Sequence, residues 1–281
     1  MFVLYDKETI PNSDTRDQAY LTSMRELNKE FPDDPDIAAL YAASYMSIGR
    51  WDYWDSEGNP KSETIPVAEA LEHIIHQDQT HPGVLHLHIH LLEASFEPER
   101  ALVSAEALEK TIPIAGHVVH MPAHIYVRVG MYQKAIESNL RSLEADARFQ
   151  AIWSDNPLPM VGTYHLSHRL HPGHATDFLR YAGTLQGNFE IAISNAFQLA
   201  TSITQESVAL GQGQKRIAAP WLVLKIFGRW DDLLNHEPAY QGTPYLDGIW
   251  AYSLGSAYLA KGNLQEAEKE LERLKAIANA P

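Results

Sequence analysis

The sequence predicts an all-α protein, a solenoid of about six antiparallel helix pairs with two inserted loops. Three observations support this fold class. Strand signals are weak along the 281 residues, and apolar residues recur mostly three or four positions apart. A turn pattern recurs along the chain, in which a large apolar residue stands two positions after a glycine and an alanine often follows three residues later. The last two glycines of this pattern, Gly228 and Gly262, are 34 residues apart.

The turn pattern marks the predicted helix ends. It reads GRW from residue 49, GMYQKA from 130, GNFEIA from 187, GRW from 228 and GNLQEA from 262. The glycine ends one helix, the large residue packs in the turn, and the alanine allows close approach of the next helix. The period of 34 is that of the tetratricopeptide repeat (TPR). Residues 251–278 closely resemble that repeat, and residues 124–146 resemble it nearly as well.

The helix pairs are expected in chain order around two interruptions. The loop WDYWDSEGNPKSETIP, residues 51–66, follows the first helix of the first pair. A second pair fills 81–112 with its turn at SFEPERA, and a third begins at GHVVHMPAHIYVRVG, residues 116–130. The second loop, 153–173, separates it from a fourth pair opening at HPGHATDFL. We interpret 1–281 as one domain, with a histidine-rich region at 81–177 and regular repeats at 178–281.

Composition limits the classes of partner. The net charge is −14, from 22 basic and 36 acidic residues, which argues against nucleic acid or an anionic membrane as a partner. The absence of cysteine excludes disulfides, thiolate metal sites and a cysteine nucleophile. No apolar run suggests a membrane span, and the N-terminus does not read as a signal peptide. We expect a soluble, cytoplasmic protein, or a periplasmic one if the natural N-terminus is longer. The oligomeric state stays open.

Histidine is concentrated in the middle of the chain, where 13 of the 14 lie between residues 73 and 174. On the first helix of the second pair, His86, His90 and Glu93 lie within about 60° of arc, and His88 points almost the opposite way. Two histidines one turn apart can hold one metal ion, and a nearby carboxylate can ligate it or orient a ligand.

The first helix of the third pair repeats this arrangement with His117, His120 and His124. Pro122 either kinks this helix or starts a new one, and in both cases His120 and His124 should remain neighbours. The fourth pair adds His174 and Asp177, one near-turn apart.

Neighbouring first helices of such repeats line one concave surface, so these clusters are expected to meet there. We predict His86, His90, His120, His124 and His174 as ligands of one or two divalent transition metals: copper, iron or zinc. Glu93, His117 and Asp177 are candidates for an additional ligand, a general base or a partner that orients a ligand. The alternative is a set of individually paired core histidines.

The remaining unusual residues have simpler interpretations. His73, His76 and His88 are expected to be solvated or packed, and His236 to lie at the surface. Two alternatives stand for histidines 165, 168 and 171, which either cap the site or lie apart from it. Trp51 is expected to pack in its turn, and the rest of WDYWD to anchor the first loop. Tyr126 and Arg128 lie one turn from His124 and are candidates for orienting a substrate, and Arg128 equally matches a solvated repeat position.

A further resemblance is carried by three stretches of the sequence: WDYWD at 51–55, HPGVLHLHIHLLEAS at 81–95 and GHVVHMPAHIYVRVGMYQKA at 116–135. Together they resemble a group of bacterial TPR proteins of mostly unassigned function. A later PHN.HFL element of that group is matched only loosely by HATDFL, with His174 and Asp177 at its two histidines. The resemblance supports a site and implies no particular reaction.

Three functions fit these features. The first is a metal-dependent enzyme with a mono- or dinuclear site, an oxidoreductase rather than a hydrolase, acting on a small molecule in the concave groove. The second is a scaffold that binds a peptide or protein in that groove. The third is a metal storage or delivery protein without catalysis.

Overall fold

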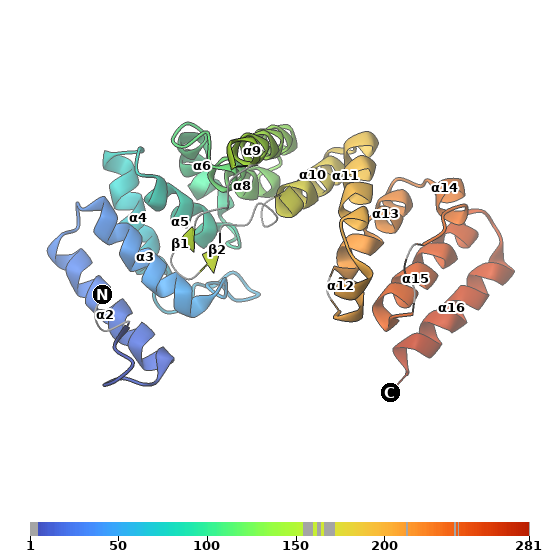
Figure 1. Cartoon of the computed structure of the whole chain (residues 1–281), viewed down its shortest axis with the longest axis horizontal. Coiled ribbons are helices and arrows are strands. Elements are labelled where there is room, and N and C mark those ends of the chain that lie inside the picture. Colours follow the sequence, from blue (N-terminus) through green and yellow to red (C-terminus); the bar gives the residue numbers. More distant parts are fainter. Residues whose placement is uncertain are drawn as a thin grey trace. The chain divides into compact units, whose positions relative to one another are not determined.

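A computed structural model describes residues 5–153, 160–161, 164–165, 172–211, 213–238, 240 and 242–280. The chain divides into two compact units, Met1–His168 and Arg169–Pro281, which we describe separately. Figure 1 shows the helices of both in chain order. The interpretation of the whole chain as a single domain stays a prediction.

The first unit consists of helices packed as successive antiparallel pairs. Helix α3 packs on α4, α5 on α6, and α7 and α8 on α9, while α2 precedes them and packs on α3. These are the first three predicted pairs. Their bounds are α2 (Ser13–Glu30), α3 (Pro35–Gly49), α4 (Thr64–Gln77), α5 (Pro82–Leu92), η1 (Pro98–Ala101), α6 (Leu102–Leu108), α7 (Gly116–His120), α8 (Pro122–Arg128) and α9 (Tyr132–Trp153).

Local sequence explains where the helices that carry the histidines begin. Helix α5 starts with a proline at its first position, and the His81 ring caps it by accepting a hydrogen bond from the Val84 amide. Pro122 opens α8 in the same way, and only Met121 separates it from α7. Proline therefore starts a new short helix here, one of the two predicted outcomes.

The first inserted loop joins α3 to α4 and is anchored by aromatic residues, as expected. Tyr53 is buried, and its hydroxyl donates to the Met46 carbonyl at 3.2 Å. Trp54 forms an isolated bridge with Pro60, and its indole donates to the Leu91 carbonyl at 2.7 Å. The loop is thereby fastened to both α3 and α5.

The second unit continues the pairing, with α10 on α11, α13 on α14 and α15 on α16. Gly187, Gly228 and Gly262 have φ between 66° and 79°, so the three predicted turn glycines of this unit adopt the left-handed conformation. The core includes Trp221 and Trp250 with ring centroids 5.0 Å apart. The bounds are α10 (Pro172–Gln186), α11 (Phe189–Thr201), α12 (Gln205–Ala209), α13 (Gln214–Ile226), α14 (Trp230–Leu234), α15 (Pro244–Ala260) and α16 (Leu264–Ala278).

The second inserted loop contains the two strands of the described residues. Strands β1 (Met160–Val161) and β2 (Tyr164–His165) pair antiparallel, with Met160 opposite His165. His168 and His171 lie outside the described residues, as does the side chain of His165, so their capping role stays a prediction.

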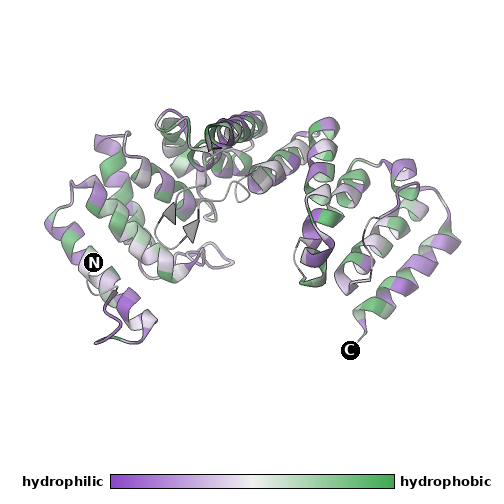
Figure 2. Cartoon of the chain, viewed as in Figure 1, coloured by the Kyte–Doolittle hydropathy of each residue, from purple (hydrophilic) through white to green (hydrophobic). Residues whose placement is uncertain are grey.

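The predicted fold class is confirmed. Helices dominate both units, and many carry hydrophobic and hydrophilic residues side by side along their length (Figure 2), as helices with one buried stripe do. None of the helices in the described ranges is long and apolar enough to cross a membrane.

Candidate metal centre

Helix α5 separates its histidines by face, as the helical spacing predicts. His86 and His90 lie on one side of the helix, and Glu93 follows at its C-terminal cap. His88 is fully buried on the other side, where its Nδ1 lies 2.8 Å from the Ser104 hydroxyl and its Nε2 lies 3.4 Å from Glu72. His88 is therefore a packing residue.

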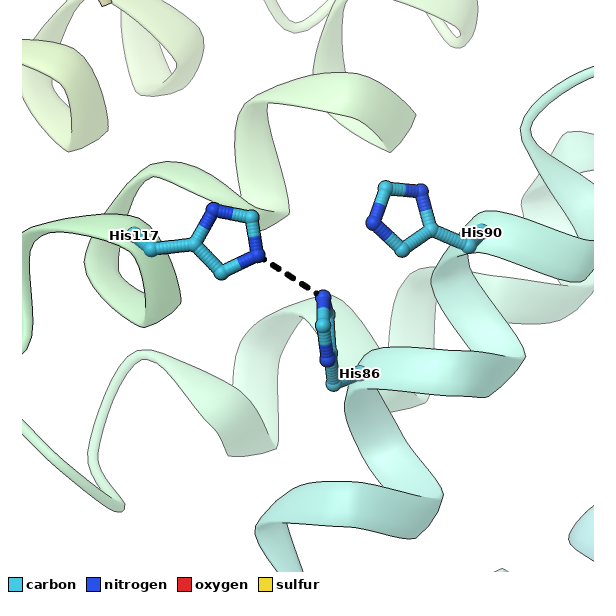
Figure 3. Close-up of side chains that lie close together, drawn as sticks. All are labelled: His86, His90 and His117. Carbon is cyan, nitrogen blue, oxygen red and sulfur yellow. Dashed lines mark hydrogen bonds between the residues drawn. The ribbon is translucent and has the colours of Figure 1, made fainter. Parts of the chain in front are cut away.

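His86, His90 and His117 form a three-histidine cluster between α5 and α7. One ring nitrogen of each lies within 4.8 Å of the others, and the Nε2 atoms of His86 and His117 are 3.0 Å apart. Figure 3 shows a ring nitrogen of His90 facing the other two rings. Because Zn–N bonds are about 2.0–2.1 Å, two nitrogens on one tetrahedral zinc lie about 3.3 Å apart. The cluster thus has nearly the dimensions of a metal site.

His120 and His124 form a facing pair, one turn apart across Met121. Their Nε2 atoms are 2.9 Å apart, and their ring centroids are 4.8 Å apart. His120 is fully buried, and the His124 side chain is nearly so. The expectation that these two residues remain neighbours despite Pro122 is confirmed.

Glu93 joins the cluster and the pair through its two carboxylate oxygens. Oε1 is 2.8 Å from Nδ1 of His90, and Oε2 accepts a hydrogen bond from Nδ1 of His124. The Glu93 side chain is only 14% exposed. Burial opposes ionisation of this carboxyl, but the hydrogen bonds from His124 and His90 outweigh it and hold the pKa of Glu93 well below its ordinary value.

The ionised carboxylate fixes the tautomers of both histidines. Since an ionised carboxylate can only accept, Nδ1 of His90 and Nδ1 of His124 must each carry a proton. In the neutral rings, each Nε2 then has a lone pair available for a metal. A carboxylate that accepts from a ligand histidine in this way is the usual support of a protein metal site.

Burial favours the neutral form of His86 as well. Loss of hydration, followed by the charge of neighbouring His90, lowers the pKa of His86 to about 4. The ring is therefore neutral near pH 7, which is the protonation state a metal requires.

Asn139, on α9, supports the facing pair and was missed in the sequence. Its Nδ2 donates to the Ala135 carbonyl at 2.7 Å, so its Oδ1 is turned towards Nδ1 of His120 at 2.6 Å. The sequence feature that could have identified Asn139 is its position, one turn after the alanine of the GMYQKA pattern, on the helix paired with α7 and α8.

Trp51 lies against the cluster, and the expectation that it packs in its turn is wrong. The residue is 62% exposed, and its indole donates to Oε1 of Glu93 at 3.1 Å. Its ring stands edge-on to that of His90, with centroids 5.7 Å apart. Arg50 and Trp51 have φ of 44° and 70°, a left-handed conformation that is unfavourable for both residues. This backbone turns the indole away from the helix turn and towards Glu93.

Arg128 is exposed, as a solvated repeat position would be, and its role in orienting a substrate stays a prediction. Its guanidinium donates to the carbonyls of Glu93 and Ser95, both at 2.8 Å, and so holds the C-terminal end of α5. Tyr126, also considered for substrate orientation, is fully buried.

The remaining residues named from the sequence belong to the second unit or, like His73, are exposed. His174 and Asp177 are on α10, where the His174 ring packs on Phe178 and Asp177 accepts from Arg180 at 2.7 Å. Their role as ligands stays a prediction. His73 is exposed and pairs with Asp33. His236, expected at the surface, is half-buried because its ring packs between those of Phe197 and Trp250.

Comparisons with known proteins support the fold and no particular activity. No family model and no curated protein matches the chain. A TPR protein of known structure from Parabacteroides merdae ATCC 43184 is similar to it, with 10% identity and a TM-score of 0.50, over 98% of this chain and 92% of that one. BtubC (BKLC) from P. vanneervenii is similar with 13% identity and a TM-score of 0.42, over 94% and 89%. The first likeness, with the helix pairs, shows a TPR-like all-α fold. The resemblance to the histidine-rich group stays a prediction.

Proposed function

We propose that this TPR-like protein is a metal-dependent enzyme with its centre at the three-histidine cluster. The observation that carries the proposal is the convergence of one ring nitrogen from each of His86, His90 and His117 within 4.8 Å. These residues come from two different helices, so helical spacing alone does not bring them together. Glu93 supports the cluster by orienting His90.

The donor set fits a transition metal better than magnesium or calcium. Imidazole nitrogen is a ligand for copper, iron and zinc, whereas magnesium and calcium prefer oxygen. We favour oxidation over hydrolysis because histidine-rich sites suit copper and iron, and such a metal, when bound, supplies one-electron chemistry. Zinc in the same cluster would favour hydrolysis instead.

The chain's own residues would prepare this centre. Glu93 keeps a proton on Nδ1 of His90 and so leaves Nε2 for the metal. The His90 side chain is 13% exposed, and this limits the access of water. The exposed part of Trp51 lies beside His90, where a small-molecule substrate would approach.

Two other functions make different predictions. Metal storage or delivery would use the same cluster without turnover. A peptide-binding scaffold, the common role of TPR arrays, would bind its peptide in the presence of a chelator as well as in its absence.

Elemental analysis by mass spectrometry of untagged protein tests the proposal. We expect near-stoichiometric copper, iron or zinc in the parent, and loss of one equivalent in the double variant His86→Ala/His117→Ala with helical content retained. His73→Ala, which removes an exposed histidine, is the matched control and should keep its metal.

The reaction is tested next, with the metal that the analysis identifies. Oxygen uptake in the presence of a reductant, lost in the double variant and retained in His73→Ala, would support an oxidoreductase. Stoichiometric metal without any turnover would favour storage or delivery. Absence of metal even after reconstitution with copper, iron and zinc would overturn the proposal.

A further inference from the structure

The facing pair of His120 and His124 presents a chemical problem that the three-histidine cluster does not solve. Two Nε2 atoms 2.9 Å apart, as here, form a good hydrogen bond only if one of them carries a proton. In a neutral imidazole only one nitrogen is protonated. The other contacts of each ring therefore decide what lies between the two atoms.

The proton of His120 is on the far side of its ring. Asn139 donates through Nδ2 to the Ala135 carbonyl, so its Oδ1 is the atom that faces His120 at 2.6 Å. An amide oxygen only accepts, so Nδ1 of His120 must be the donor. Nε2 of neutral His120 consequently presents a lone pair to His124.

The proton of His124 is also on the far side of its ring. Its Nδ1 contacts Oε2 of Glu93, whose other oxygen accepts from the Trp51 indole, and a carboxylate oxygen accepts rather than donates. Nε2 of neutral His124 therefore presents a lone pair to His120. Two lone pairs 2.9 Å apart in a buried site repel each other, and a metal cation bound to both would relieve that repulsion.

We propose that His120 and His124 hold a second metal ion, linked to the three-histidine cluster through Glu93. Each ring has the support that a metal ligand requires, an amide oxygen for His120 and a carboxylate for His124. The same carboxylate orients His90 in the first site, so one residue prepares ligands for both ions. The inference deepens the proposed function and makes the centre dinuclear.

Zinc counting separates the two sites without relying on activity. Metal-free parent protein, titrated with zinc and freed of excess, should retain two equivalents. His124→Gln and His120→Gln should each retain one equivalent, bound at the three-histidine cluster. His86→Ala/His117→Ala should also retain one equivalent, bound at the facing pair. Glutamine keeps a polar side chain at each buried position. Far-UV circular dichroism checks that every variant is folded, and His73→Ala is the control with two equivalents.

Nitrogen NMR of the metal-free protein supplies a second test, which does not depend on any variant. We expect Nε2 of His120 and His124 to show the shifts of unprotonated nitrogen and to move on addition of the second equivalent of zinc. A parent that retains a single zinc, unchanged in His124→Gln, would overturn the second site and leave the proposed function intact. A shared proton on the two Nε2 atoms that persists at saturating zinc would also overturn it. Loss of zinc only in the facing-pair variants would instead contradict the proposed centre at the three-histidine cluster.

Discussion

Glu93 is the residue on which both groups of histidines depend. One oxygen faces His90 and the other faces His124, so a single side chain sets the tautomers of two candidate ligands from different helices. The sequence placed Glu93 on the histidine face of its helix, but its position between two clusters depends on how the helices pack.

Replacing Glu93 by glutamine should weaken both metal sites. The amide removes the negative charge and offers one acceptor where the carboxylate offers two, and loss of such a support reduces metal affinity by about 10- to 100-fold. Chelator competition with zinc would measure the effect at each equivalent. Glu97→Gln is the matched control, since the Glu97 side chain is 66% exposed and pairs with Arg100. Equal affinities for parent and Glu93→Gln would contradict this role.

Trp51→Gly should lower metal affinity while leaving the free energy of unfolding nearly unchanged. Glycine adopts φ of 70° without steric cost, so relief of strain of about 1–2 kcal/mol offsets the greater freedom of the unfolded chain. We expect the free energy of unfolding to change by less than about 1 kcal/mol. Metal affinity should fall several-fold, because Glu93 loses the indole hydrogen bond.

The control for this variant is Arg50→Gly, which relieves similar strain next to Trp51 and should leave metal binding unchanged. Urea unfolding and chelator competition on the same samples provide both readouts. A large loss of stability in Trp51→Gly with unchanged affinity would show that Trp51 serves the fold.

At the scale of helices, Arg128 connects α8 to the end of α5. We expect Arg128→Met to destabilise the protein by about 1–3 kcal/mol, because two carbonyl groups lose a charged donor. Metal affinity should fall as well, since one of these carbonyls belongs to Glu93. Thermal unfolding and zinc competition measure the two effects. Arg148→Met, which alters an exposed pair within α9, should change neither.

Glu72 links α4 to α5 and η1, and it should make stability depend on pH. The hydrogen bond from His88 lowers the pKa of Glu72, burial opposes this shift, and Arg100 adds to it. A carboxyl with a lowered folded-state pKa stabilises the protein above its unfolded value of about 4.5, and this stabilisation is lost as the pH falls through the folded value. The urea midpoint of the parent should therefore fall more steeply below pH 4.5 than that of Glu72→Gln. Parallel curves for the two proteins would contradict the prediction.

The helices were predictable because local signals and tertiary packing agree. The turn glycines ended helices where expected, and proline opened α5 and α8. Trp51 was not predictable, since a turn pattern gives no information on a left-handed pair of residues preceding a loop. Asn139 was missed because its importance arises from the packing of α9 on α7.

For the molecule as a whole, the histidine spacing predicted which residues meet within the first unit but not which of them form one group. Helical geometry assigned His117 a secondary role, whereas its Nε2 lies 3.0 Å from that of His86. Grouping depends on the rotation and distance of α7 relative to α5, which a single sequence does not encode in any short pattern. The contribution of His174 depends on the second unit and stays a prediction.

Hydrogen exchange measured on the full chain should show how far metal binding stabilises it. Zinc should slow the exchange of backbone amides in α5, α7 and α8, because it links these helices and favours their folded state. Amides of α15 and α16 should be unaffected, since in a solenoid each repeat contacts only its neighbours. Slowing in α10 would support His174 as a further ligand. The His86→Ala/His117→Ala/His124→Gln variant should lose the effect, and uniform slowing of all helices in the parent would contradict a local origin.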